Sequence, residues 1–192
     1  MRDGDWGQLT FEVDEIVTKL GQVYPYDWAT FIDTRLNQPG QPAPVGGIEK
    51  GGYKLVWKEE PNPFDKARMA EAKNLPLAWS LGVSIDKDAR VTSTQWDSPA
   101  FNAGVVTGSR VLAVNGIAYT ADELKKAITA AKDGRGVELL FQRGDKFQTV
   151  KIDYRGGLRY PWLERAAPGT APTGLDLLLM PKRPGAGTKG KK

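Results

Sequence analysis

Two short segments near the start of the chain carry apolar residues at helical spacing. In the first, positions i, i+3, i+4 and i+7 are Val13, Ile16, Val17 and Leu20. In the second, the apolar residues are Trp28, Phe31, Ile32 and Leu36. Such spacing places side chains on one face of a helix, and Thr10 and Asp27 stand where N-caps are expected. Both helices therefore need a partner for their apolar faces, either in this chain or in another domain.

A stretch without regular period separates these helices from the rest. Residues 38–47 contain three Pro and three Gly, which predicts a linker. Beyond it, Tyr53 to Lys58 alternates between two sides and predicts a strand. Asp65 to Lys73 is a polar segment of helix formers, for which we expect a short surface helix or a mobile insertion.

From residue 79 to residue 154 strand-like and helix-like patterns alternate. The β-rich runs are Val83 to Asp86, Arg90 to Trp96, Arg110 to Val114, Val137 to Gln142 and Lys146 to Asp153. Ser98 and Pro99 open a short helix, and Asp122 to Lys132 has the helical period. The sequence therefore predicts an α+β fold, a partly open β-barrel with one long and one short helix, preceded by a short helical segment.

Two residue types are missing from the chain. Without His or Cys it cannot build a His-containing catalytic triad, a Cys nucleophile, a disulfide or the usual His/Cys zinc site. An enzyme that works through carboxylates alone stays open as an alternative, and the candidates are Glu59, Glu60, Asp122 and Glu123. Such adjacent pairs point in different directions on a strand or helix, so solvated side chains are expected. We therefore expect no catalytic residue, no metal ligand and no cofactor in this chain.

The net charge of +4 is concentrated at the end of the chain. Five basic residues lie in the last eleven positions, which hold no acid: Lys182, Arg183, Lys189, Lys191 and Lys192. The other residues comprise 22 basic and 23 acidic side chains, whereas a nucleic-acid-binding domain carries a basic face on its folded part. We expect a disordered basic tail over residues 181–192 and no nucleic-acid partner. No run of 18 apolar residues occurs, so we expect no membrane partner and a soluble chain.

Several short motifs resemble those of a PDZ domain, particularly the bacterial type attached to proteases. The matching segments are Ser80-Leu81-Gly82-Val83, Asp97-Ser98-Pro99-Ala100, Ala103-Gly104 and Val111-Leu112-Ala113-Val114-Asn115-Gly116. They stand in the family's order, and a helix follows at the right distance. Ser109 departs from the pattern, because an acidic residue is common there. The resemblance implies that a partner's extended C-terminus adds as a strand beside Val83 to Asp86, taken as an edge strand.

The groove that this resemblance implies has a backbone part and an apolar part. The N–H groups of Leu81, Gly82 and Val83 would converge on the terminal carboxylate, and Gly82 allows its close approach. The two-residue period puts Leu81, Val83 and Ile85 on one side. The candidate peptide-binding residues are Leu81, Gly82, Val83, Ser84, Ile85, Leu124 and Ile128. Leu124 and Ile128 would be buried in any such fold, so packing in the core is the alternative.

Segments outside this region resemble the C-terminal part of the glycyl aminopeptidase family of PDZ-containing zinc metallopeptidases. They include Val23-Tyr24-Pro25-Tyr26-Asp27-Trp28, Trp96-Asp97-Ser98-Pro99-Ala100-Phe101 and Arg155-Gly156-Gly157-Leu158-Arg159-Tyr160-Pro161. The resemblance implies the helical end of a missing peptidase domain (1–40), a linker (41–52), a PDZ-like domain (53–157, core 77–154) and a C-terminal packing segment (158–180). The family's zinc motif H-E-x-x-H is absent here, so zinc is expected in the missing catalytic domain. Export or a periplasmic location of the parent is compatible with the family.

The predicted function is therefore peptide recognition without catalysis. The expected partners are a peptide or protein C-terminus and the missing catalytic domain. The alternative is a structural brace for the peptidase domain, in which the chain's own C-terminal segment, for example Leu158 to Met180, fills the groove.

Overall fold

The computed structural model describes residues 11–40 and 42–181, which belong to two units. The first unit ends at Val45 and the second begins at Gly46. All but the first residue of the predicted basic tail lie outside the described residues. None of the helices in the described part of the chain is both long enough and apolar enough to cross a membrane.

The first unit contains the two predicted helices, α1 (Val13–Val23) and α2 (Trp28–Leu36). Asp27 caps α2 as predicted, because its carboxylate accepts a hydrogen bond from the Thr30 N–H at 3.0 Å. Glu12 is the N-cap residue of α1 and makes no side-chain cap bond, while the predicted cap Thr10 lies outside the described residues. No residue of either helix is buried, so both apolar faces stay accessible within this unit.

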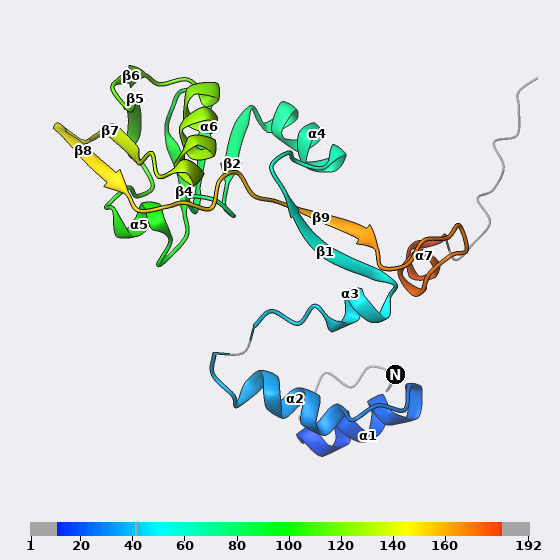
Figure 1. Ribbon diagram of the computed structural model, residues 1–192. Coiled ribbons are helices and arrows are strands. Elements are labelled where there is room, and N and C mark those ends of the chain that lie inside the picture. The colour runs from blue at the N-terminus through cyan, green and yellow to red at the C-terminus, as the bar shows by residue number, and fades with distance from the viewer. Residues whose placement is uncertain (1–10, 41, 182–192) are drawn as a thin grey trace, which may run out of the picture. The chain divides into compact units, whose positions relative to one another are not determined.

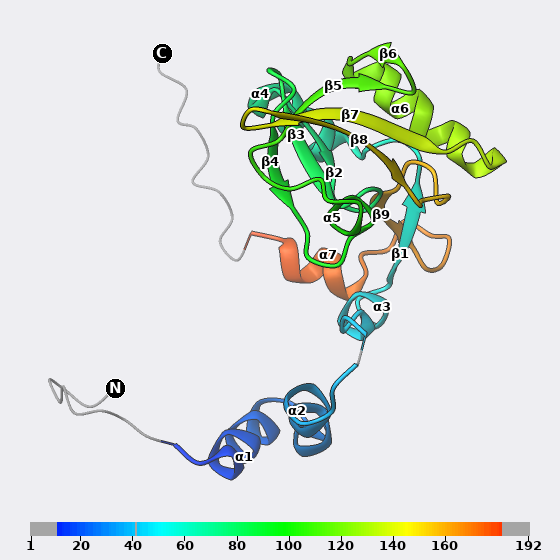
Figure 2. The same cartoon turned by 90° about the vertical axis from the view of Figure 1, so that its left-hand side faces the viewer.

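The second unit holds a body, residues 74–154, built on two small antiparallel sheets. The first sheet has the order β2 (Asn74–Leu77), β3 (Val83–Asp86) and β4 (Val91–Thr94). The second has the order β6 (Ile117–Ala118), β5 (Arg110–Val114), β7 (Val137–Arg143) and β8 (Lys146–Ile152). The long strands β7 and β8 run across the direction of the first sheet (Figure 2). Both sheets stay open, which confirms the predicted α+β fold.

Two helices complete the body. α5 (Pro99–Asn102) begins after Ser98, whose hydroxyl accepts a hydrogen bond from the Phe101 N–H. α6 (Ala121–Ala130) continues into a short 3-10 turn, η1 (Ala131–Asp133), so the predicted helix begins one residue earlier and ends in a tighter turn. Thr120 caps α6 through the Glu123 N–H, and such caps are worth about 1 kcal/mol each.

The hydrophobic core lies between the sheets and α6. Along β7 the side chains of Val137, Leu139 and Phe141 are buried and those between them are half-buried, as the two-residue period predicts. Leu124 and Ile128 of α6 are also fully buried in this core. Burying each such side chain stabilises the fold by about 1.5–3 kcal/mol.

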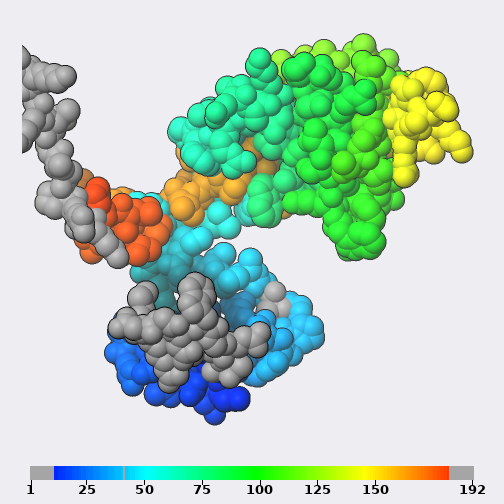
Figure 3. Space-filling model, turned by 180° about the vertical axis from the view of Figure 1, so that it is seen from behind, coloured from blue at the N-terminus to red at the C-terminus, as the bar shows by residue number. Residues whose placement is uncertain are grey.

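Five further elements lie outside the body. They are α3 (Gly46–Lys50), β1 (Tyr53–Lys58), α4 (Pro63–Ala72), β9 (Tyr160–Arg165) and α7 (Gly174–Leu179). β1 and β9 pair in antiparallel register, and we call this pair the ribbon. Figure 1 shows the ribbon leading away from the body towards α7, and in Figure 3 the green and yellow atoms of the body form one continuous mass. β1 and α4 were predicted, whereas α3, β9 and α7 were not.

The segment between the body and the ribbon packs back on the body. Leu158 contacts the core, and Tyr160 is 4% exposed. The Arg159 N–H donates to the Ser80 hydroxyl at 3.1 Å, and the Tyr154 hydroxyl donates to the Gly157 carbonyl at 2.8 Å. Residues 155–159, which include Gly156 and Gly157, therefore have a structural role: they fix the position at which β9 begins.

Candidate peptide-binding groove

β3, the strand at which peptide addition was expected, is not an edge strand. It pairs with β4 on one side and with β2 on the other. The expectation of an edge strand is therefore wrong, because a segment that the sequence analysis left unassigned supplies the missing neighbour. In the folded chain, residues 74–77 stand where an added strand was expected.

β2 lies beside β3 in the direction that a bound C-terminus would take. The register pairs Asn74 with Asp86 and Leu77 with Val83, so the end of β2 reaches the loop that precedes β3. There the Leu77 carbonyl accepts hydrogen bonds from the Gly82 N–H at 2.9 Å and from the Ser80 N–H at 3.0 Å. The Leu77 carbonyl oxygen thus holds the place predicted for a terminal carboxylate.

The loop that receives this carbonyl depends on a glycine. Gly82 has φ +82°, a left-handed conformation that L side chains rarely adopt. A Cβ atom at this position would lie 2.1 Å from the Ser98 Cβ. The loop carbonyls are also held, because Gln95 N–H donates to the Gly82 carbonyl and Ala100 N–H donates to the Leu81 carbonyl. The loop is therefore a fixed backbone site whose shape excludes larger residues.

The structure brings the predicted apolar residues together. Leu81, Val83, Ile85, Leu124 and Ile128 are each at most 2% exposed and belong to one cluster. Gly82 is buried, and Ser84 is half-buried on the opposite side of β3. Packing of Leu124 and Ile128 in the core is thus observed. Whether any of these seven residues contacts a peptide stays a prediction.

The cluster also includes two residues of β2, the strand beside β3, that the predicted set did not contain. Leu75 and Leu77 of β2 are 4% and 1% exposed and pack in the same cluster. The sequence analysis assigned no element to residues 74–77. The two-residue spacing of these leucines is a strand signal, but Pro76 between them weakens it, because proline cannot donate to a ladder. The burial of these two leucines shows that β2 occupies the groove beside β3.

The segment that occupies the groove is not the one expected if the chain were a structural brace. That alternative filled the groove with the C-terminal segment. Instead, β9 pairs with β1, and Leu175 at the start of α7 donates its N–H to the Gly51 carbonyl at 2.9 Å. The chain fills its own groove, but with residues that precede the loop.

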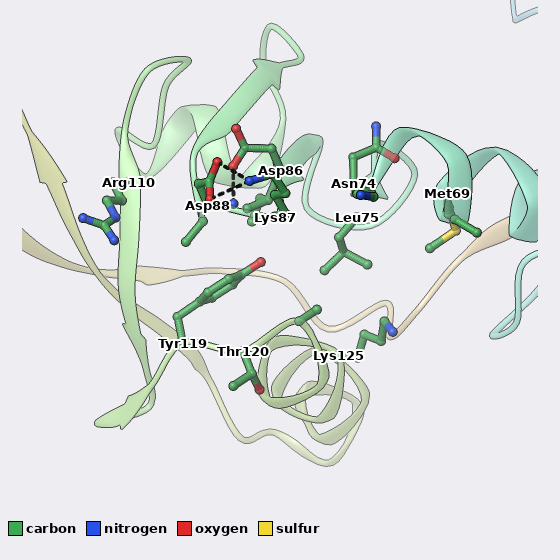
Figure 4. A pocket seen from close by; sticks show the side chains of 15 residues that line it. Met69, Asn74, Leu75, Asp86, Lys87, Asp88, Arg110, Tyr119, Thr120 and Lys125 are labelled. Carbon is green, nitrogen blue, oxygen red and sulfur yellow. Dashed lines mark hydrogen bonds and ion pairs between the residues drawn. The ribbon is translucent and has the colours of Figure 1, made fainter.

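A cavity of about 840 Å³ opens where β2 and β3 meet the start of α6 (Figure 4). Leu75 and Ile85 contribute apolar surface to it. Its charged lining residues are Lys73, Asp86, Lys87, Asp88, Arg110 and Lys125. Tyr119 also lines it, and burial, followed by the charge of Asp86, raises the pKa of its phenol. Both signs of charge occur, so the cavity offers no single charge preference.

The carboxylates considered for catalysis are ordinary surface groups. Each pairs with a lysine: Glu59 with Lys132, Glu60 with Lys66, Asp122 with Lys125 and Glu123 with Lys126. Among residues 11–40 and 42–181 no three acidic side chains gather in a way that could hold a metal ion. These four carboxylates are thus held in ion pairs at the surface.

Comparison with known proteins identifies the body. Residues 68–154 match the family model of the PDZ domain, so the chain contains a PDZ domain, a module that typically binds peptides. None of the curated proteins matches the sequence significantly.

Three solved structures resemble the chain. An aminopeptidase N family protein from Idiomarina loihiensis has a TM-score of 0.52 at 14% identity, over 89% of this chain and 29% of its own. The HtrA3 PDZ domain bound to a phage-derived ligand (FGRWV) has a TM-score of 0.29 at 15% identity. The match covers 59% of this chain and 92% of the HtrA3 domain. A PDZ domain protein from Parabacteroides distasonis has a TM-score of 0.33 at 11% identity. The match covers 82% of this chain and 41% of that protein. At such identities the likeness concerns the fold alone, and the chain spans less than a third of the first protein.

Proposed function

We propose that this chain is the non-catalytic peptide-recognition region of a zinc metallo-aminopeptidase, and that its PDZ domain binds an extended C-terminal peptide by strand addition beside β3. One observation carries the proposal: the groove already holds a strand, β2, with its last carbonyl on the Gly82 N–H. A groove that accepts one strand in this direction has the backbone geometry for another.

The chemistry of recognition follows from the contacts of β2. The backbone of β3 would supply ladder hydrogen bonds, which give affinity without regard to sequence. The terminal carboxylate would take the place of the Leu77 carbonyl and accept from the loop N–H groups near Gly82. The apolar wall around Leu81, Leu124 and Ile128 would hold the last side chain. Recognition would therefore depend on a free carboxylate and an apolar end.

The peptidase context is supported by two kinds of likeness. The sequence resembles the glycyl aminopeptidase family, and the fold is similar to an aminopeptidase N family protein of which the chain covers 29%. The zinc of such an enzyme does not fit this chain, which has no His and no Cys, so it would be bound by a catalytic domain encoded elsewhere in the parent. This region would present or position a peptide for that domain.

An NMR titration of the full chain tests the proposal. Pooled peptides ending in apolar residues are added as free acids and, as the matched control, as C-terminal amides. We expect the amide signals of residues 81–85 and 124–128 to shift with the free acids and to stay in place with the amides. Equal shifts with both sets would refute carboxylate recognition, and the absence of shifts at any concentration would refute peptide recognition by the chain with β2 in place.

The position of β2 also favours a second candidate function, that of a structural brace. If β2 never leaves, the PDZ domain is a brace that ties α4 and the ribbon to the body. Hydrogen exchange at the Gly82 N–H separates the two functions, because this group is bonded to the Leu77 carbonyl. A brace predicts exchange only through global unfolding, whereas a groove that can open predicts exchange at a lower free energy than the core strands.

A further inference from the structure

We propose that β2 is an internal ligand, which occupies the groove in the resting chain and which an outside C-terminus must displace. The inference rests on the proposed function and adds regulation and a ligand class to it. Its basis is that β2 reproduces the contacts of a bound peptide: antiparallel pairing with β3, a final carbonyl on the Gly82 N–H, and two buried side chains.

The internal ligand is short compared with the long strands of the second sheet. β2 has four residues, whereas β7 and β8 have seven each. Lys73, which leads into β2, has φ 48°, a left-handed conformation that costs about 1–2 kcal/mol in a residue with a side chain. This conformation caps the end of α4, so β2 begins directly after a helix cap.

The segments beside β2 would allow it to move. α4, which precedes it, has no buried residue, and the cavity at the start of α6 is open beside Leu75. Figure 4 shows the Leu75 side chain pointing towards the turn of α6 that carries Lys125. Release of β2 would leave the pairing of β3 with β4 and of β7 with β8 unchanged.

The internal ligand also indicates what the groove accepts. Leu77 holds the position of a last residue and Leu75 that of the third from last, and both are buried against the core. Pro76 lies between them opposite Ser84, where both residues are half-buried. The displacing ligand is therefore a C-terminus with apolar side chains at the last and third-from-last positions and a tolerant position between them.

The cost of displacement appears as reduced affinity. When the binding-competent state is populated to a fraction f, the apparent Kd is the intrinsic Kd divided by f. A tethered competitor acts at an effective concentration that reaches the millimolar range for short linkers. A variant without a competent β2 is expected to bind the same peptide at least tenfold more tightly.

Two variants of the full chain test the proposal. In the opened variant, the changes Asn74→Gly, Leu75→Ser, Pro76→Gly and Leu77→Ser remove the ligand features of β2 and keep the chain length. In the lockable variant, Pro76→Cys and Ser84→Cys place two thiols on directly opposite residues, where an antiparallel pair can form a disulfide. Because the chain has no other Cys, no other pairing competes.

The probe is the fluorescein-labelled peptide Ala-Lys-Asn-Leu-Pro-Leu, a copy of residues 72–77, as a free acid and as an amide. Fluorescence polarisation is expected to give at least tenfold tighter binding of the acid to the opened variant than to the unchanged chain, and no binding to the oxidised lock. Reduction of the lock should restore the affinity of the unchanged chain. This comparison uses one protein and remains decisive if the opened variant does not fold.

The outcomes separate this inference from the proposed function. The internal ligand would be overturned if the opened variant and the unchanged chain bound the free-acid peptide equally. Equal binding by the oxidised and the reduced forms of the lockable variant would have the same meaning. Either result would leave peptide recognition standing. Failure of every folded form, the opened variant included, to bind the acid would overturn peptide recognition itself.

Discussion

Two strand pairings in this molecule lie outside the pattern predicted from the sequence, and they differ in what surrounds them. β2 pairs with β3 and buries Leu75 and Leu77 to 4% and 1% exposure. In the ribbon, β1 pairs with β9 over six residues, yet Leu55 and Leu163, which face each other, stay 36% and 47% exposed. The longer pairing is therefore the less buried one.

This difference shows that backbone pairing and burial are separate contributions. The ribbon pairs the backbone groups that its two strands turn towards each other. It adds surface contacts, such as the Lys58 amine with the Glu164 carboxylate at 2.8 Å and the Arg159 guanidinium over Trp57. A two-stranded ribbon is marginally stable in water by itself, and exposed ion pairs contribute little. β2 gains much more because the groove removes its side chains from water.

The largest expected effect compares one leucine from each pairing. Leu77→Ala should lower the free energy of unfolding by about 2–5 kcal/mol, because it leaves a cavity in the core. Leu163→Ala removes the same atoms from a half-exposed side chain and should cost less than about 1 kcal/mol. Urea unfolding followed by circular dichroism measures both. Equal losses would mean that the ribbon is as well buried in solution as β2.

A smaller effect is expected from the glycines that shape the two pairings. Gly82 and Gly52 both have φ near +85°, and an added Cβ would meet Ser98 in the body and Thr173 beside the ribbon. Gly82→Ala should cost about 2–4 kcal/mol, combining left-handed strain with overpacking. Gly52→Ala should cost less, because Thr173 is half-buried and can move.

Gly104→Ala is the matched control for these two changes. Its φ is +88° and an added Cβ would meet nothing within 4 Å, so it isolates the strain of about 1–2 kcal/mol. Thermal unfolding of the three variants gives the ranking. If Gly82→Ala were no more harmful than Gly104→Ala, the loop would not be tightly fitted around Ser98.

The smallest expected effect is a pH response confined to the ribbon's far end. The Asp176 carboxylate accepts hydrogen bonds from the Thr173 N–H and the Tyr53 hydroxyl, and these, with the nearby Arg165, lower its pKa from 3.8 to about 2. A lowered pKa stabilises the folded state above pH 4, and this contribution is lost as the pH falls towards 2. The start of α7 should therefore loosen in this range.

Amide NMR signals of Thr173 and Leu175 between pH 5 and pH 2 test this response. The Asp176→Asn variant is the control, because it has no carboxylate to protonate and should lose the pH dependence of these two signals. A response that persists in the variant would assign the change to another group.

Local patterns were sufficient to predict most of the body. α6 and β7 were found because their apolar residues repeat at the periods of a helix and a strand, and α5 was found because Ser98 and Pro99 mark a helix start. α7 was missed, although Thr173 and Asp176 form a capping box. Its leucines run consecutively, without a helical period.

The composition of the candidate groove was predictable, but its occupancy was not. Gly82 and the alternation of Leu81, Val83 and Ile85 are properties of one short segment. The pairing of β3 with β2 depends on which segment reaches the groove, and Pro76 weakens the strand signal of residues 74–77. Likewise, β9 contains Pro161 and finds its partner about a hundred residues earlier in the chain, a relation that no local period reveals.

The position of β2 directly before the loop also affects the order of events in folding. Only residues 78–82 separate β2 from β3, so the two strands can meet as soon as β3 itself has been synthesised. Hairpins form in about 1–10 μs, whereas a partner at micromolar concentration arrives at roughly 0.1–10 per second for ordinary association rates. A newly made chain will thus close its groove on itself long before it encounters any other protein.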